Sequence, residues 1–243
     1  MRQVLFAAAI LAVPGIANAD FEIESATTEE NAVQFEISNS VFFGDVNNGE
    51  DASRHEVGIA WGVLNPWTTE LSFAFSVPRG DGPSFDGIEW SNTIGLVGGE
   101  ASVSEELAVA IYTSFAFDNG AAEDVLLTAG PTISYNTGSV ELGLNTFVQV
   151  PLGGGNDPGF AYAFGAMTDV AQGVGVGFEA HGEIAQAFGN ASDFDQQEHF
   201  LGPVVEVQST QGEQTAEIKL GVFAGLTEAT PTVAVSADVG FGF

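Results

Sequence analysis

Residues 232–243 read TVAVSADVGFGF, and this last stretch of the chain decides the fold. Apolar side chains alternate with small or polar ones as far as Phe241 and Phe243. Because successive side chains of a β-strand point to opposite faces, one face of this strand is apolar along its whole length. The ends of soluble domains usually fray in water. The pattern therefore favours a strand that closes a barrel in lipid.

The same alternation recurs from about residue 32 onward, and we count twelve runs. Many runs are about 10 to 13 residues long, whereas a soluble strand has about 5 or 6 and a bilayer-spanning strand about 9 to 11. Small or polar residues fill the intervening positions, such as Thr128, Gly130 and Thr132. The sequence predicts an all-β fold, a transmembrane antiparallel up-and-down β-barrel of about 12 strands.

Alternation by itself does not decide whether the apolar face points inward or outward. A soluble barrel buries its apolar face around a central cavity, whereas a membrane barrel turns it toward lipid and lines its lumen with small polar residues. Aromatic residues gather near the ends of the runs, for example Trp61, Trp67 and Trp90, where membrane barrels have aromatic girdles. Together with the run lengths, this placement predicts that the apolar face meets lipid.

The connections between the runs alternate in length. Short turns are expected on the periplasmic side, at 65–67, 98–101, 137–138, 171–172 and 210–212. Longer connections are expected on the extracellular side, at 44–54, 79–86, 118–123, 152–158 and 189–197. This asymmetry is typical of outer-membrane barrels, and it requires an even strand number if both chain ends are periplasmic.

The first residues have the features of a cleaved export signal. Arg2 supplies the positive charge, residues 4–13 the apolar segment and residues 17–19 a small-x-small cleavage site. We therefore expect a signal peptide over 1–19 and a single barrel domain over 20–243. Residues 20–30 do not fit the strand count, and we expect them to form either a short periplasmic strand or an extension of the first barrel strand.

The chain is strongly acidic, with 33 Asp and Glu residues, four Lys and Arg residues and a net charge of −29. Such a charge repels nucleic acid and suits an exported protein surrounded by salt, because salt screens like charges. The sequence contains no Cys, which excludes disulfides, thiol catalysis and Cys-ligated metals. No cofactor is expected.

An acidic band is predicted on the inward face of the late strands. Strand alternation places Glu179, His181 and Glu183 on one face. The hairpin connections are expected to bring His181 opposite Glu206, and Glu206 opposite Glu217. The field of such carboxylates attracts cations without requiring a fixed geometry. The band therefore predicts a passive channel for small solutes that favours cations or neutral molecules.

Lys219 is expected to form an ion pair with Asp238 on the closing strand. The alternative to a channel is a barrel closed by its own loops, with a structural or surface-adhesive role. A metal site is not expected, because carboxylate spacing on adjacent strands is not specific for a metal. Residues 45–56 and 153–157 have faint similarity to calcium loops, and the sequence favours plain turns there.

A surface hydrolase is a more distant alternative. His55 and His199 lie at the extracellular starts of two runs, next to Glu56 and Glu198. An acid and a histidine at the extracellular rim are what barrel proteases require, and phospholipases require a Ser–His pair. Neighbouring His and Glu residues are expected by chance in so acidic a chain, so the sequence favours a protein that is not an enzyme.

The final aromatic residue resembles the end of bacterial outer-membrane barrels, in which a C-terminal Phe on an alternating strand is read by the barrel-assembly machinery. This resemblance implies that Phe241 and Phe243 form an assembly signal and that the machinery binds Phe243. It also implies a location in the outer membrane, in contact with its lipid and lipopolysaccharide.

Residues 55–243 resemble the small outer-membrane barrels of the phenol-degradation MetA-pathway type. The resemblance rests on Val77-Pro78-Arg79-Gly80-Asp81, on Gly130-Pro131, on His199-Phe200-Leu201-Gly202-Pro203 and on the terminal Phe. It implies a channel or uptake role for small solutes, and it transfers no catalytic residue.

Overall fold

The computed structural model describes residues 23–26, 30–44, 51–78, 80, 82–98, 107–118, 125–153, 157–189 and 193–243. The expected signal peptide, 1–19, lies outside the described residues, and so does the loop segment 45–50. Within the described ranges, no helix is both long and apolar enough to cross a membrane.

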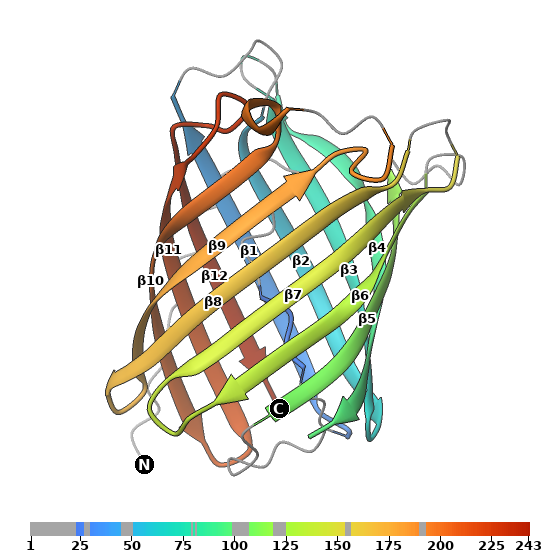
Figure 1. The fold of residues 1–243 in the computed structure, drawn as a ribbon. Helices are drawn as coiled ribbons and strands as arrows, with labels where there is room; N and C mark the ends of the chain where they lie inside the picture. Colours follow the sequence, from blue (N-terminus) through green and yellow to red (C-terminus); the bar gives the residue numbers. More distant parts are fainter. Residues whose placement is uncertain are drawn as a thin grey trace.

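The described part of the chain forms twelve antiparallel strands that close into a barrel (Figure 1). Each strand pairs with its neighbours in the sequence, and β1 closes the barrel by pairing with β12. The prediction of an all-β, twelve-stranded antiparallel barrel is confirmed. A 3-10 turn, η1, covers Phe194–Gln196. The strands are β1 (Val33–Phe43), β2 (Asp51–Leu64), β3 (Trp67–Pro78), β4 (Ser84–Val97), β5 (Leu107–Asp118), β6 (Val125–Asn136), β7 (Glu141–Pro151), β8 (Gly159–Ala171), β9 (Val174–Ile184), β10 (Glu198–Gln211), β11 (Gln214–Gly225) and β12 (Val233–Gly242).

Large apolar side chains cover the outside of the barrel. Trp61 on β2, Phe178 on β9 and Leu220 on β11 are each more than half exposed. An apolar surface of this extent is unfavourable in water and favourable against lipid, so the apolar face points outward as predicted. Trp90 is the seventh of the 14 residues of β4, so its expected place near a strand end was wrong. It belongs to the apolar band.

The last residue of the chain takes part in closing the barrel. The Phe243 amide donates to the Val33 carbonyl at 2.9 Å, and the Val33 amide donates to the Phe243 carbonyl at 3.1 Å. The Phe243 ring meets the Phe35 ring edge-on, with the ring centres 6.0 Å apart. The apolar alternation that reaches the end of the sequence is therefore the outer face of the seam between β12 and β1.

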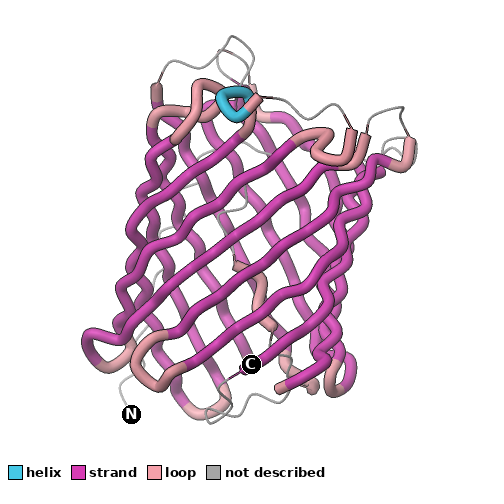
Figure 2. The backbone as a smooth tube through the Cα atoms, in the orientation of Figure 1, coloured by secondary structure: helices cyan, strands magenta, loops and turns pink. Residues whose placement is uncertain are grey.

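The two ends of the barrel differ in the length of their connections (Figures 1 and 2). The short-turn end carries the turns at 65–66, 137–140, 172–173 and 212–213 and the C-terminus. The loop end carries the described residues 152–153 and 157–158, 185–189 and 193–197 with η1, and 226–232. The expected short turns are confirmed at these four positions. The fifth, at 98–101, was expected too short, because β4 ends at Val97 and β5 begins at Leu107; residues 99–106 lie outside the described residues. The connection 226–232 between β11 and β12 was not predicted as a loop of its own.

Candidate functional site

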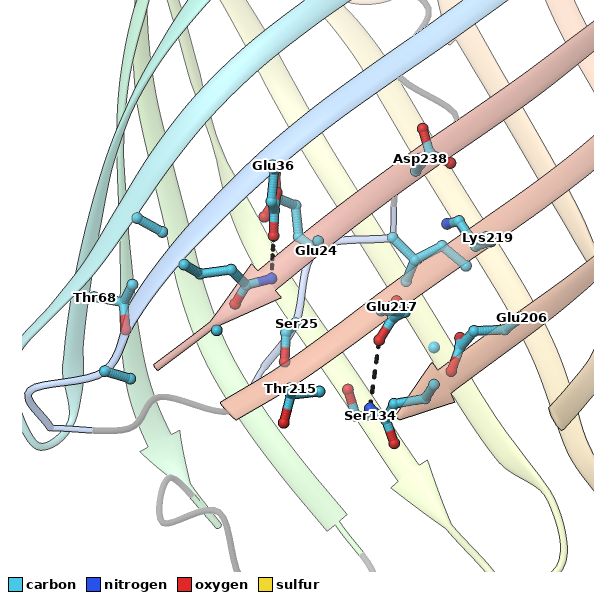
Figure 3. Close-up of a pocket in the computed structure, with 18 of the residues that line it drawn as sticks. Glu24, Ser25, Glu36, Thr68, Ser134, Glu206, Thr215, Glu217, Lys219 and Asp238 are labelled. Atoms are coloured by element: carbon cyan, nitrogen blue, oxygen red, sulfur yellow. Dashed lines mark hydrogen bonds between the residues drawn. The ribbon is translucent and has the colours of Figure 1, made fainter. Parts of the chain in front are cut away.

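A cavity of about 1240 Å³ occupies the lumen and reaches the short-turn end. Figure 3 shows some of the residues that line it. Turn residues Gly138, Ser139 and Gly212 border its mouth. Glu179 and Lys219 lie at its inner end, each about halfway along its strand. The cavity therefore extends from the periplasmic-type turns to the middle of the barrel.

The lining of the cavity is strongly acidic. Among the described residues that line it, eleven carry a carboxylate side chain and one, Lys219, carries a positive charge. Strand alternation explains this, because the outward positions of the same strands are apolar and the inward ones polar. The carboxylates are those of Glu24, Glu30, Glu36, Glu70, Glu141, Asp169, Glu179, Glu206, Glu213, Glu217 and Asp238.

Buried ionic contacts mark the inner end of the cavity. The Lys219 ammonium lies 3.3 Å from one carboxylate oxygen of Glu179, whose residue is only 3% exposed. His181 Nε2 lies 3.1 Å from the other oxygen of the same carboxylate. In the strand register Lys219 is the partner of Glu206 on β10 and of Asp238 on β12. One ammonium group thus lies among three carboxylate-bearing strand positions.

The structure separates the residues of the predicted acidic band. Glu179, Glu206 and Glu217 line the cavity, together with the expected pair Lys219 and Asp238. His181 and Glu183 lie two and four residues farther along β9, toward the loop end. Glu183 is the register partner of Glu198. It therefore belongs to a different part of the lumen from Glu179.

The predicted register between β9 and β10 was wrong by six residues. His181 is the partner of Phe200, and Glu206 is the partner of Gly175. The error arose because β9 ends at Ile184, so the connection begins at 185 and not at 189 as expected, and the strand ends pair directly across it, Glu183 with Glu198. The expected pairing of Glu206 with Glu217 was also wrong, by two residues, because Glu217 pairs with Gln208.

Residues 23–26 lie inside the barrel, against the wall formed by β5, β7 and β8. Ile23 contacts the inward positions Gly143 and Gly165, where a Cβ atom would overlap its side chain. Ala26 is fully buried and packs with Ala108 and Ala110 of β5. For these described residues, both expectations, a periplasmic strand and an extension of β1, were wrong. The glycines at 143 and 165 provide the space that the segment occupies.

The backbone of this segment is also bonded to the barrel wall. The Glu24 amide donates to the side-chain carbonyl oxygen of Asn145 on β7, a residue that is 0% exposed. Figure 3 shows Glu24 and Ser25 in the middle of the cavity, facing the side chains of β1, β11 and β12. The segment therefore narrows the path along the lumen.

An apolar layer fills part of the lumen beyond the cavity. It consists of Phe42, Phe200, Val204, Phe223 and Ala234, all buried, with Met167 packed against it. These residues occupy inward strand positions, like the polar residues below them. Sequence reasoning missed the layer because it assigned all inward positions to a polar lining. The sequence did contain a signal for this layer. Phe42, Phe200 and Phe223 are large aromatic residues at inward positions, where most other residues are small.

The His-Glu neighbours do not form acid–base pairs. His55 and Glu56 are consecutive strand residues, so their side chains point to opposite faces of the barrel wall. His55 is bonded to the Asn39 side chain, which lies at an outward position. His199 likewise lies apart from Glu198. This geometry contradicts the pairing that the hydrolase hypothesis required.

His199 is held in a small aromatic cluster on the outer wall at the loop end. The Tyr162 hydroxyl lies 3.0 Å from its Nδ1, and Gln197 Oε1 lies 3.0 Å from its Nε2. Phe194 of η1 stacks on the imidazole with 4.9 Å between ring centres. These contacts attach the connection 185–197 to the barrel.

No group of three or more metal-ligating side chains is found within the described ranges. The region with similarity to a calcium loop at 45–56 falls partly outside those ranges.

No family model matches the chain, and no curated protein sequence matches it. Similar solved structures include an outer-membrane channel from Pseudomonas putida F1, with a TM-score of 0.60, 12% identity, and coverage of 94% of this chain and 100% of that one. The NanC porin matches with a TM-score of 0.57 and 8% identity, over 86% of this chain and 98% of that one. The KdgM porin matches with a TM-score of 0.52 and 7% identity, over 87% and 98%. At sequence identities this low, the similarity to these structures establishes the fold of the chain and nothing about its function.

The closed barrel, its apolar exterior and its polar lumen together define the class of protein. The chain has the fold of an outer-membrane β-barrel, and its structural neighbours are porins and channels.

Proposed function

We propose that this protein is a passive outer-membrane channel for small solutes that favours cations and neutral molecules over anions. One observation carries the proposal: a cavity of about 1240 Å³ at the short-turn end, lined by eleven carboxylate residues and Lys219 among the described residues. A cleft lined by one sign of charge with low-dielectric walls concentrates counter-ions and repels ions of the same sign. Carboxylate-lined pores favour cations for this reason.

The proposal includes the location and the partners expected from the sequence. The protein would lie in the bacterial outer membrane, with its apolar exterior against lipid and lipopolysaccharide, after export with a cleaved signal peptide. The barrel-assembly machinery would bind Phe243, whose ring and backbone form the end of the seam. The fold shared with the Pseudomonas putida F1 channel supports the channel role that the resemblance to MetA-pathway-type barrels implies, though not that family itself.

The acidic lining argues against anionic solutes. One similar structure is described as KdgM porin in complex with disordered oligogalacturonate, a polyanion. The eleven carboxylates of the present cavity would repel such a ligand. The proposal therefore does not transfer that ligand to this chain.

Ion selectivity in planar bilayers tests the proposal. Purified, refolded protein is inserted under a tenfold KCl gradient, and the reversal potential of the steps is measured. A pore with the proposed lining gives steps whose reversal potential has the sign of cation selectivity. Steps that reverse with the sign of anion selectivity would refute the cation preference.

A second candidate is a structural or surface-adhesive barrel that conducts nothing. It is favoured by the contents of the lumen, because residues 23–26 lie against one wall of the cavity and the apolar layer lies beyond the cavity. Silence of the folded wild-type protein across many insertions would support this candidate against the channel.

A further inference from the structure

The aromatic rings of the apolar layer lie between two charged parts of the lumen. On the short-turn side is the cavity, which ends at Glu179 and Lys219. On the loop side lie Arg54, Glu183 and Glu198, and the charge of Arg54 acts on both carboxylates. Glu183 is four residues beyond Glu179 on β9, a distance of about 13 Å along a strand. Phe200 of the layer is the register partner of His181, which lies between these two carboxylates on β9.

The contacts within the layer are dense. Phe42, Ala234 and Phe223 are cross-strand partners on β1, β12 and β11. The Phe42 and Phe200 rings lie with their centres 6.4 Å apart. Phe223 is 0% exposed, so the cavity does not reach its ring. Water therefore has no direct contact with the centre of the layer.

Small inward residues beside Phe223 allow its ring to lie in this place. A Cβ atom on Gly221 would overlap the Phe223 ring, and one on Gly202 would overlap the backbone of Phe223. Alternation of large and small inward residues is how narrow barrels fill their interior. The ring therefore occupies space that Gly221 leaves open on its own strand, while Gly202 allows the backbones of β10 and β11 to approach each other closely.

A guanidinium group and an imidazole ring contact two of the rings in the layer. The Arg54 guanidinium carbon lies 4.9 Å from the centre of the Phe42 ring, in a cation–π arrangement. The His181 ring meets the Phe223 ring edge-on, 5.4 Å away, and its Nε2 is bonded to Glu179. An ion that moves from the cavity toward the loop end would thus leave the carboxylates and pass aromatic and aliphatic side chains before it reaches Arg54.

We infer that Phe42, Phe200 and Phe223 form the constriction that limits the passage of solutes and hydrated ions between the cavity and the loop end of this barrel. The inference rests on the proposed channel function and assigns the residues that restrict it. Apolar constrictions limit conduction because water and ions leave them, and an ion that enters loses hydration that carbon atoms do not replace. The acidic cavity would set the sign of the permeating charge, and the apolar layer would set the size and hydration of what passes.

Replacement of the central ring tests this inference. Phe223→Ala removes the ring and Phe223→Leu keeps a smaller apolar side chain, so conductance should rise several-fold in the first variant and less in the second. Phe42→Ala probes a second ring of the same layer. Phe178→Ala is the matched control, because Phe178 is an outward residue of β9 that is 58% exposed. Each variant is first shown to be folded by its heat-modifiable mobility in gels.

The outcomes separate this inference from the proposed function. If wild-type protein conducts, and folded Phe223→Ala and Phe42→Ala conduct no better than Phe178→Ala, the constriction lies elsewhere and the inference is refuted, while the channel function stands. If wild-type protein is silent and Phe223→Ala conducts, the inference is supported and passive conduction by the wild type is refuted. Silence of the folded wild-type protein and of both layer variants would overturn the inference.

Discussion

The acidic cavity makes a quantitative prediction about ion selectivity. Its lining gives a formal charge of about −10, and one unit charge in about 1240 Å³ corresponds to a concentration of about 1.3 M. The concentration that corresponds to even one uncompensated carboxylate in the cavity is thus more than tenfold higher than that of a bath of about 0.1 M salt. Wild-type protein is expected to approach the ideal cationic reversal potential of about 59 mV for a tenfold gradient of a monovalent salt.

Two sets of substitutions at the same five cavity carboxylates test whether the charge of the cavity determines ion selectivity. Conversion to Gln leaves a formal charge of about −5, which still far exceeds the bath concentration, so the reversal potential should remain cationic. Conversion of the same residues to Lys brings the formal charge to about zero, and the reversal potential should fall toward zero. The five residues are Glu36, Glu70, Glu141, Glu213 and Glu217.

The Gln set is the matched control, because it changes the same positions by side chains of similar length. The measurement is the reversal potential in planar bilayers at low salt, repeated at about 1 M salt, where screening should weaken the preference. Equal reversal potentials for the Gln and Lys sets would refute the argument that the cavity charge selects the ion.

Three further predictions follow from local contacts. Gly165→Leu should displace Ile23 from the barrel wall, since a Cβ at this position overlaps that side chain, and limited proteolysis should then cut the N-terminal segment faster than in Gly82→Leu, a substitution where a Cβ meets no neighbouring atom. Lys219→Met should lower the free energy of unfolding by about 3–5 kcal/mol at most, because it leaves the buried Glu179 carboxylate without its ammonium partner; a urea titration that matches wild type would contradict this. Deletion of Phe243 removes two backbone hydrogen bonds to Val33 at about 0.5–1.5 kcal/mol each, so the yield of folded barrel should fall, whereas Phe243→Ala, which keeps those bonds, should fold better.

The sequence by itself determined the architecture. Period-two alternation is a local property of extended chain, so strand number, strand direction and the outward apolar face could be read from runs such as 233–243. The positions of the short turns followed from the breaks between these runs. The acidity of the lumen followed from the same parity, because the inward positions carry nearly all the carboxylates of the strands.

The contents of the lumen were decided by tertiary structure. Which inward residues meet depends on register across connections, and the end of β9 at Ile184 placed His181 opposite Phe200 rather than Glu206. The place of residues 23–26 depended on space left by Gly143 and Gly165, more than 100 residues later in the chain. Alternation in the sequence indicates which face of the barrel wall a side chain occupies. It does not indicate which side chains from distant strands lie at the same height inside the closed barrel. The packing of those side chains decides what fills the interior.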